Sequence, residues 1–257
     1  MNNVTQENID RFSGFTGLYS ANRPVPPQII TKIILVYLPA SPQLVVDIGS
    51  GTGLSTMIWR DIAPRVVGIE PNGDMRKAAQ QAAAGNVVFQ EGYSNRTGLP
   101  DASADVVTIS QAFHWMDIPS TLDEVYRILK PGGVFAVYDA DWPPCVDWMV
   151  EKEYKALNRK CNAVKPPASY NYKSEHLRRF EEYGRFRFVK EALCHSVEPC
   201  TPERMIGIAL SQGCVQGALK LDPSIQKDID VYCDIVKERC PASFEIVFPY
   251  RLRLAIK

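Results

Sequence analysis

Residues 44–54 constrain the fold of this chain more than any other stretch. They read LVVDIGSGTGL, an apolar run and an acid followed by three glycines at alternate positions. Glycine is needed where the backbone takes a positive φ or where a ligand comes closer than a Cβ would allow. We therefore expect a buried strand over 44–48, a tight loop containing Gly49, Gly51 and Gly53, and a helix directly after it, with the loop touching a ligand.

Strand and helix signals alternate along most of the chain, which is typical of a doubly wound parallel sheet. We therefore predict an α/β fold, Rossmann-like and doubly wound, preceded by an aromatic and polar lead-in over 6–27. The expected strands are 44–48, 65–70, 87–90, 105–110, 134–138, 186–197 and 244–256. The expected helices are 28–38, 54–62, 72–84, 118–129, 146–161, 174–183, 202–219 and 223–239.

Composition and charge exclude several classes of protein. Hydrophobic residues make up 46% of the 257 residues, which suffices for a core, and 29 basic residues balance 29 acidic ones, so no global field attracts nucleic acid. The first residues lack the apolar segment of a signal peptide, and the longest apolar stretch, 29–38, is too short to span a bilayer. We expect a cytoplasmic protein with no nucleic-acid or membrane partner.

Cysteine and histidine spacing points away from a disulfide framework and from a metal centre. The seven cysteines include no CxxC pair, and the three histidines do not stand at ligand spacing with them or with each other. The sequence therefore predicts reduced cysteines packed as small hydrophobic residues, and no metal.

An acid downstream of the glycine loop narrows the kind of ligand. Glu70 ends the second expected strand, where a carboxylate can accept hydrogen bonds from both hydroxyls of a ribose, so an adenosine-type cofactor is indicated. A nicotinamide dinucleotide site needs G-x-G-x-x-G, but the sixth position counted from Gly49 is Leu54, and a glycine comes one residue early. S-adenosylmethionine has no phosphate and carries positive charge, which backbone carbonyls and the nearby Asp47 would complement.

These residues resemble the first motif of the class I S-adenosylmethionine-dependent methyltransferases. Glu70 resembles the ribose-binding acid of that family, and the loop after the third strand resembles its adenine pocket. Residues 104–107 resemble its fourth strand, and 129–133 resemble the turn before its fifth strand. The resemblance implies a mostly parallel seven-stranded sheet whose last strand is antiparallel. Within the family, residues 19–27 and 111–115 are similar to a small-molecule subgroup that includes trans-aconitate methyltransferase.

The resemblance also implies which residues form the site. The residues expected to bind the cofactor are Tyr19, Arg23, Asp47, Gly49, Gly51, Gly53, Glu70, Pro71, Tyr93, Ser94 and Gln111. Whether Glu91, Ser94 or only backbone groups read the adenine stays open. Arg23 and Tyr19 are expected to close over the methionine carboxylate of the cofactor, with surface packing as the alternative. His114, Trp115 and Trp142 are expected to line the acceptor pocket, and His114 is the candidate general base.

The predicted function is transfer of a methyl group from S-adenosylmethionine to a small molecule, by in-line displacement that depends mainly on proximity. A carboxylate acceptor, as in the trans-aconitate enzymes, would need no base. A nicotinamide-dependent oxidoreductase and a non-catalytic adenosylmethionine-binding protein are the alternatives, and a monomer or homodimer is expected. The expected division is one methyltransferase domain over 1–257, with N-terminal cap helices (1–38), a cofactor-binding core (39–140), a helical insertion or lid over the acceptor (141–185) and a C-terminal completion of the sheet (186–257).

Overall fold

A seven-stranded sheet with the strand order β3-β2-β1-β4-β5-β7-β6 forms the centre of the molecule. The computed structural model describes residues 3–10, 13–167 and 171–257, so 11–12 of the expected lead-in and 168–170 of the expected insertion lie outside the described residues. The parallel strands are β1 (Leu44–Ile48), β2 (Arg65–Ile69), β3 (Val87–Gln90), β4 (Ala104–Ser110) and β5 (Leu129–Ala140). Strand β7 (Phe244–Ile256) runs antiparallel to β5 and to β6 (Phe188–Cys200), which confirms the predicted fold.

Helices cover both faces of the sheet, because successive residues of a strand point to opposite sides. One face packs against α3 (Gln28–Val36), α4 (Gly73–Ala82) and the short 3₁₀ helix η1 (Met57–Trp59). The other face packs against α5 (Ile118–Ile128) and α7 (His176–Tyr183). Val45 and Val46, neighbours in β1, are fully buried on opposite faces, so a strand buried on both sides reads as a continuous apolar run.

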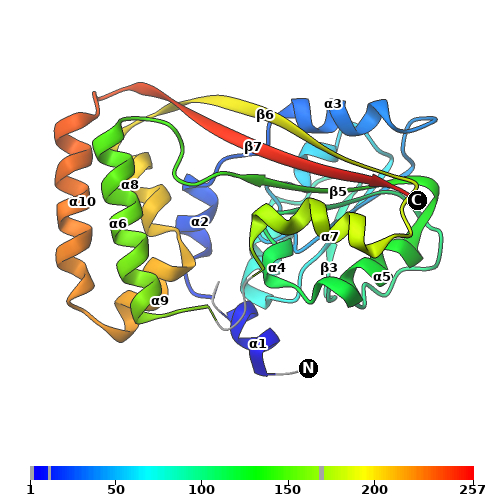
Figure 1. Ribbon diagram of the computed structural model, residues 1–257, viewed down its shortest axis with the longest axis horizontal. Coiled ribbons are helices and arrows are strands. Elements are labelled where there is room, and N and C mark those ends of the chain that lie inside the picture. The colour runs from blue at the N-terminus through cyan, green and yellow to red at the C-terminus, as the bar shows by residue number, and fades with distance from the viewer. Residues whose placement is uncertain (1–2, 11–12, 168–170) are drawn as a thin grey trace.

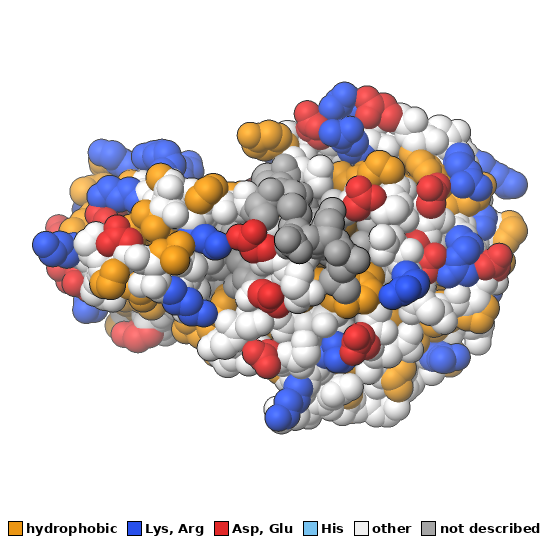
Figure 2. All heavy atoms as spheres, turned by 90° about the horizontal axis from the view of Figure 1, so that it is seen from below, with side chains coloured by type: hydrophobic (Ala, Val, Ile, Leu, Met, Phe, Trp, Pro, Cys, Tyr) orange, Lys and Arg blue, Asp and Glu red, His pale blue; other side chains and the backbone are white. Residues whose placement is uncertain are grey.

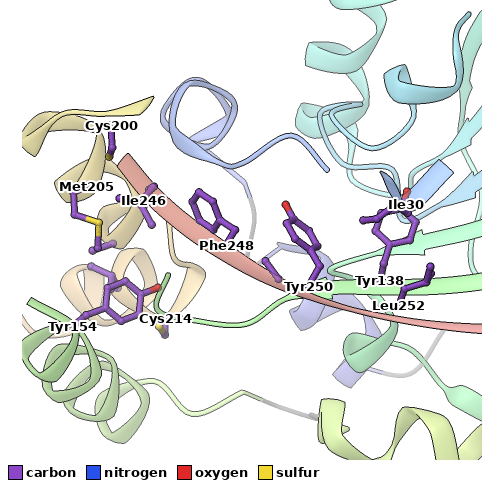
Figure 3. Packing of buried hydrophobic residues seen from close by; sticks show 14 of the residues in the cluster. Ile30, Tyr138, Tyr154, Cys200, Met205, Cys214, Ile246, Phe248, Tyr250 and Leu252 are labelled. Carbon is purple, nitrogen blue, oxygen red and sulfur yellow. The ribbon is translucent and has the colours of Figure 1, made fainter. Parts of the chain in front are cut away.

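A second group of helices forms a helical lobe beside the sheet (Figure 1). It consists of α6 (Trp148–Val164), α8 (Pro202–Leu210), α9 (Gly213–Leu221) and α10 (Ile225–Arg239), and α2 (Thr16–Asn22) packs against α8. Helix α1 (Asn3–Asp10) precedes α2 at the N-terminal side. Strand β7 reaches from the sheet into the lobe, and its Phe248, Tyr250 and Leu252 belong to one hydrophobic cluster that spans both parts (Figure 3). The sheet and the helical lobe therefore share a core.

Three expected elements differ from the structure. The expected helix over 54–62 consists of turns around η1, because the hydroxyls of Ser55 and Thr56 are bonded to the carboxylate of Asp47 and hold this segment against the end of β1. The expected helix over 202–219 is split into α8 and α9, since Gln212 takes an extended conformation. The expected break at 130–133 is an irregularity inside β5, where Gly132 has φ +78°.

The surface carries charges of both signs. In the face that Figure 2 shows, acidic and basic side chains are interspersed over the helical lobe and the wider body of the sheet. Across residues 3–10, 13–167 and 171–257, no helix is long and apolar enough to cross a membrane. In the same ranges, no group of three or more His, Cys, Asp or Glu side chains is arranged to hold a metal ion.

Candidate functional site

A cavity of about 570 Å³ opens beyond the ends of β1, β2 and β4. The chain reverses its winding direction between β1 and β4, and open α/β sheets bind ligands at such a switch point. We call this space the first cavity. Its described lining residues are Asn8, Ile9, Tyr19, Ile48, Gly49, Gly51, Ile69, Glu70, Pro71, Met75, Gly92, Tyr93, Ser94, Asn95, Arg96, Ser110, Gln111, Ala112, Trp115, Met116 and Asp117.

The three glycines of the loop have different roles. All three have positive φ angles, +70° at Gly49, +56° at Gly51 and +90° at Gly53. A Cβ on Gly49 would lie 2.8 Å from the Cβ of Ala112, and one on Gly53 would lie 2.8 Å from the ring of Phe89. A Cβ on Gly51 would meet nothing within 4 Å and would project from the cavity wall. Gly49 and Gly51 thus border the cavity, whereas Gly53, expected to bind the cofactor, allows the loop to pack on β3.

Glu70 lies directly after β2 and closes one side of the loop. Its Oε2 accepts a hydrogen bond from the backbone N–H of Gly51 at 2.8 Å, and its Oε1 accepts one from the N–H of Asn72 at 2.8 Å. Burial raises the pKa of Glu70 although both of these hydrogen bonds act in the opposite direction. Each carboxylate oxygen retains a second acceptor position, so the group can still receive ligand hydroxyls at the cavity wall.

Asp47 does not take the position expected of a cofactor ligand. Its side chain is fully buried and lines none of the described cavities. Its Oδ2 accepts hydrogen bonds from Ser55 and Thr56 at 2.6 Å each, and its Oδ1 accepts one from Thr108 at 2.8 Å. Burial raises the pKa of Asp47 against these three hydroxyls. Asp47 thus ties the segment after the glycine loop to β4 from inside, and its expected contact with the cofactor stays a prediction.

The loop after β3 contributes a further part of the first cavity. Pro71, Tyr93 and Ser94, which are expected to bind the cofactor, all line it. Glu91 does not, because its carboxylate pairs with Arg76 at 2.9 Å and points to the exterior. Ser94 and the backbone of this loop therefore border the first cavity, and which group reads an adenine stays a prediction.

A second cavity of about 490 Å³ adjoins the first between the sheet and the helical lobe. Tyr19, Gln111 and Trp115 border both spaces. Gln111 follows β4 with φ +54°, a conformation that turns the chain at this shared wall. The described residues that line the second cavity are Tyr19, Arg23, Gln111, His114, Trp115, Trp142, Asn158, Asn162, Pro167, Tyr172, Lys173, Gln212, Gly213 and Cys214.

Arg23 lies where the glycine loop meets the second cavity. Its guanidinium carbon is 4.8 Å from the ring centres of both Tyr19 and Trp142, and its Nη2 donates a hydrogen bond to the carbonyl of Ser211 at 3.0 Å. That carbonyl lies at the break between α8 and α9. The buried Nε of Arg23 has no hydrogen-bond partner in the described part of the chain. A small space of about 50 Å³ is lined by both Arg23 and Gly51.

His114 is 5% exposed and forms part of the second cavity's wall. Its Nδ1 lies 3.8 Å from Oδ1 of Asp139. Burial first, and then the charge of Lys173, hold the pKa of His114 well below its ordinary value. The imidazole is therefore neutral near pH 7, and it lines the second cavity together with Trp115 and Trp142, whose expected role in acceptor binding stays a prediction.

Two charged residues of the site were not anticipated from the sequence. Lys173 donates a hydrogen bond from Nζ to Oε1 of Gln111 at 2.6 Å and lies 3.1 Å from Oδ1 of Asp139. Asp139 is fully buried; burial alone would raise its pKa, but Lys173 and His176 more than offset this and hold the pKa well below its ordinary value. Asp139 lies near the end of β5, so its place at the carboxyl edge of the sheet was an available signal. No local pattern singles out Lys173, which lies between α6 and α7.

Comparison with known proteins identifies the segment that carries the loop. Residues 46–137 match the family model described as "Methyltransferase domain". An uncharacterised methyltransferase of Mycobacterium tuberculosis is 35% identical over 123 residues, which are 48% of this chain and 49% of the relative. A ubiquinone/menaquinone biosynthesis C-methyltransferase of Rubrivivax gelatinosus is 28% identical over 162 residues, 60% of this chain and 63% of the relative.

A solved structure extends the similarity of fold to nearly the whole chain. A provisionally assigned type II methyltransferase from Anaeromyxobacter dehalogenans superposes with a TM-score of 0.70 at 20% identity, and the match covers 91% of this chain and 97% of the other. In sequence, the match spans only about half the length of the Mycobacterium relative. The matched segment contains the glycine loop, Glu70 and the shared wall at Gln111. Residues 46–137 therefore belong to a class I S-adenosylmethionine-dependent methyltransferase domain.

Proposed function

We propose that this protein transfers a methyl group from S-adenosylmethionine to a small-molecule acceptor. The observation that carries the proposal is the pair of adjoining cavities with a common wall of Tyr19, Gln111 and Trp115. A methyltransferase needs two such spaces, one for the methyl donor and one for the acceptor, and the two spaces must meet at the methyl group. In this proposal the first cavity takes the cofactor and the second takes the acceptor.

Several features of the first cavity fit S-adenosylmethionine. The open space in front of Gly51 lets a ligand approach the backbone, and the carboxylate of Glu70 suits two ribose hydroxyls. The unpartnered Nε of Arg23 suits the methionine carboxylate, next to the small space that borders Gly51. Ser94 and the neighbouring backbone would face the adenine.

The chain's own contribution to the reaction is orientation and exclusion of water. Bound S-adenosylmethionine supplies an electrophilic methyl group on its sulfonium, so the donor is already activated. Correct positioning of the two reactants can contribute about 7–11 kcal/mol to lowering the barrier. Trp115 and Trp142 would hold the acceptor in the second cavity, and the neutral His114 would form part of its wall. No general base is required for an acceptor that is already a good nucleophile.

A carboxylate is the acceptor class that we infer for the second cavity. Its described lining includes two cations, Arg23 and Lys173, together with neutral polar and aromatic side chains, and no acid. Carboxylates are ionised near neutral pH and would be attracted to this wall without needing deprotonation. One relative named above is a C-methyltransferase, so the product must be analysed for the atom methylated.

Ligand-dependent thermal stability and methyl transfer together test the proposal. At a hundred times its Kd, a ligand stabilises the folded state by about 2.7 kcal/mol. For a chain of this size, that raises the Tm by about 5–10 °C. We expect this shift with S-adenosylmethionine and none with NAD, followed by transfer of a radiolabelled methyl group to a member of a metabolite panel.

The two alternatives predict different results. A Tm shift with NAD alone would indicate a nicotinamide-dependent oxidoreductase. Binding of S-adenosylmethionine without methyl transfer to any compound of a broad panel would indicate a non-catalytic binding protein. Either result would reject the proposal.

A further inference from the structure

We propose that Lys173 is the residue that selects an anionic acceptor, by binding the acceptor's carboxylate in the second cavity. The proposal rests on the function proposed above and deepens it by assigning the two cations of the cavity to different ligands. Arg23 serves the cofactor and Lys173 serves the acceptor.

The position of Lys173 places an ammonium group at the wall where the two cavities meet. Lys173 begins the 3₁₀ helix Lys173–Glu175, and its side chain is 19% exposed. Nζ donates to Oε1 of Gln111 at 2.6 Å, and Gln111 borders both cavities. Oδ1 of Asp139 lies 3.1 Å from the same nitrogen. The contact with Gln111 is a hydrogen bond and the contact with Asp139 is an ion pair, and Lys173 itself lines the second cavity.

The carboxylate of Asp139 contacts Lys173 and also other side chains. Its Oδ2 lies 3.4 Å from Nη1 of Arg253, whose side chain is 1% exposed. Nδ1 of His176 lies 3.5 Å from the same oxygen. One buried carboxylate therefore faces two cations, although Glu191 also bonds to Arg253 at 2.8 Å. Lys173 nevertheless brings a positive charge to a cavity whose described lining contains no acid.

The other polar groups of the cavity are less suited to this role. Arg23 is held between two aromatic rings, donates to Ser211, and also borders the small space beside the glycine loop. His114 is neutral near pH 7 and offers no charge. Gly213 and Cys214 in the first turn of α9 also line the cavity, and the N-terminal end of a helix adds to its positive potential.

Matched pairs of acceptors test this assignment. The probes are benzoic, cinnamic, fumaric and indole-3-acetic acid, each compared with its own primary amide, with methyl transfer from radiolabelled S-adenosylmethionine as the readout. The variants are Lys173→Gln, which removes the charge, and Lys173→Arg, which keeps it. Lys160→Gln is the control, because Lys160 is 59% exposed on α6, pairs with Asp228 and lies outside the cavity.

We expect the wild type to methylate at least one of the acids in preference to its amide. Lys173→Gln should raise the KM for that acid at least tenfold, leave the Kd of S-adenosylmethionine within twofold, and leave any activity toward amides unchanged. Lys173→Arg should recover most of the loss, and Lys160→Gln should match the wild type.

Other outcomes overturn the assignment. One is methylation of amides or amines only, or of no probe at all while S-adenosylmethionine binds. Another is an equal loss toward acids and amides in Lys173→Gln, which would indicate a purely structural role. Failure of the wild type to bind S-adenosylmethionine would instead reject the proposed function itself, so the two failures are distinguishable.

Discussion

Replacing Gly51 with alanine separates the conformational role of the glycine loop from its role in binding. The new Cβ would meet no protein atom within 4 Å, so the folded protein has room for it. The backbone at Gly51 has φ +56°, however, and an L-residue in this region costs about 1–2 kcal/mol. The same methyl group would project into the space that we assign to the cofactor.

Gly85 provides a matched control. It has φ +61°, a Cβ there would also meet nothing within 4 Å, and it lies in the exposed turn between α4 and β3. Both Gly51→Ala and Gly85→Ala should therefore lower the stability by about 1–2 kcal/mol, or the Tm by about 2–8 °C. Only Gly51→Ala should affect the ligand. Inserting a methyl group into a filled space costs about 1–3 kcal/mol, which corresponds to about a 5- to 150-fold loss of affinity.

Titration calorimetry with S-adenosylmethionine and thermal unfolding of the free proteins measure the two effects separately. The reasoning would be refuted if Gly51→Ala bound the cofactor within twofold of the wild type. It would also fail if Gly85→Ala lost affinity to the same extent, since the loss would then follow from backbone strain rather than from the filled space.

Three further perturbations test other parts of the site. Glu70→Gln should weaken S-adenosylmethionine binding about 10- to 100-fold, because hydrogen bonds to a charged group contribute about 1.5–3 kcal/mol. Because burial raises the pKa of Glu70, the wild type should release a proton when it binds S-adenosylmethionine in mildly acidic buffer, and the variant should not. Calorimetry in buffers of different ionisation enthalpy measures this proton release. Equal release by both proteins would contradict the expectation. Arg23→Lys should lower the affinity for S-adenosylmethionine about tenfold, because the variant loses the stacking contact on Tyr19 and the planar set of donors. Arg185→Lys is the control, since it removes a comparable stacking contact on Tyr126 outside the cavities and should not change this affinity. Similar affinities for both variants would argue against a cofactor role for Arg23. Asp139→Asn should lose about 3–5 kcal/mol in urea unfolding at neutral pH. The pKa of Asp139 is lower in the folded state, so its stabilisation is complete above its ordinary value of 3.8 and declines as the pH falls through the folded value; a deficit that persists unchanged in strong acid would contradict the charge-based explanation.

The sheet could be predicted from the sequence because its signals are local. The five residues of β1 are buried on both faces, and such a strand reads as a short apolar run that the glycine loop ends. Glu70 could be placed for the same reason, since a residue that ends a parallel strand lies at the ligand edge. The antiparallel last strand came from the family resemblance and is confirmed by the pairing of β7 with β5 and β6.

The remaining parts of the site depend on contacts that no local pattern encodes. Asp47 stands beside the glycine loop, but only the neighbouring strand shows that its carboxylate accepts a hydrogen bond from Thr108. Lys173 meets Gln111 and Asp139 across distant segments of the chain. The chain breaks between α8 and α9 next to Ser211, whose carbonyl accepts a hydrogen bond from Arg23. The apolar residues before and after this break are spaced as in one helix, so the sequence did not predict it. The expected division of the chain into N-terminal cap helices, cofactor-binding core, lid over the acceptor and C-terminal completion of the sheet stays a prediction. Residues of the expected lid, 141–185, do line part of the second cavity.

The position of β7 between β5 and β6 bears on the order in which the chain folds. Val134 pairs with Ile256, and Phe188 pairs with the same residue from the other side, so the strand joins segments that are distant in sequence. Contacts of this kind form slowly because a long loop must close before they can form. We therefore expect the half of the sheet that carries the glycine loop to gain protection from hydrogen exchange earlier in refolding than β6 and β7. Simultaneous protection of both halves in a pulse-labelling experiment would contradict this order.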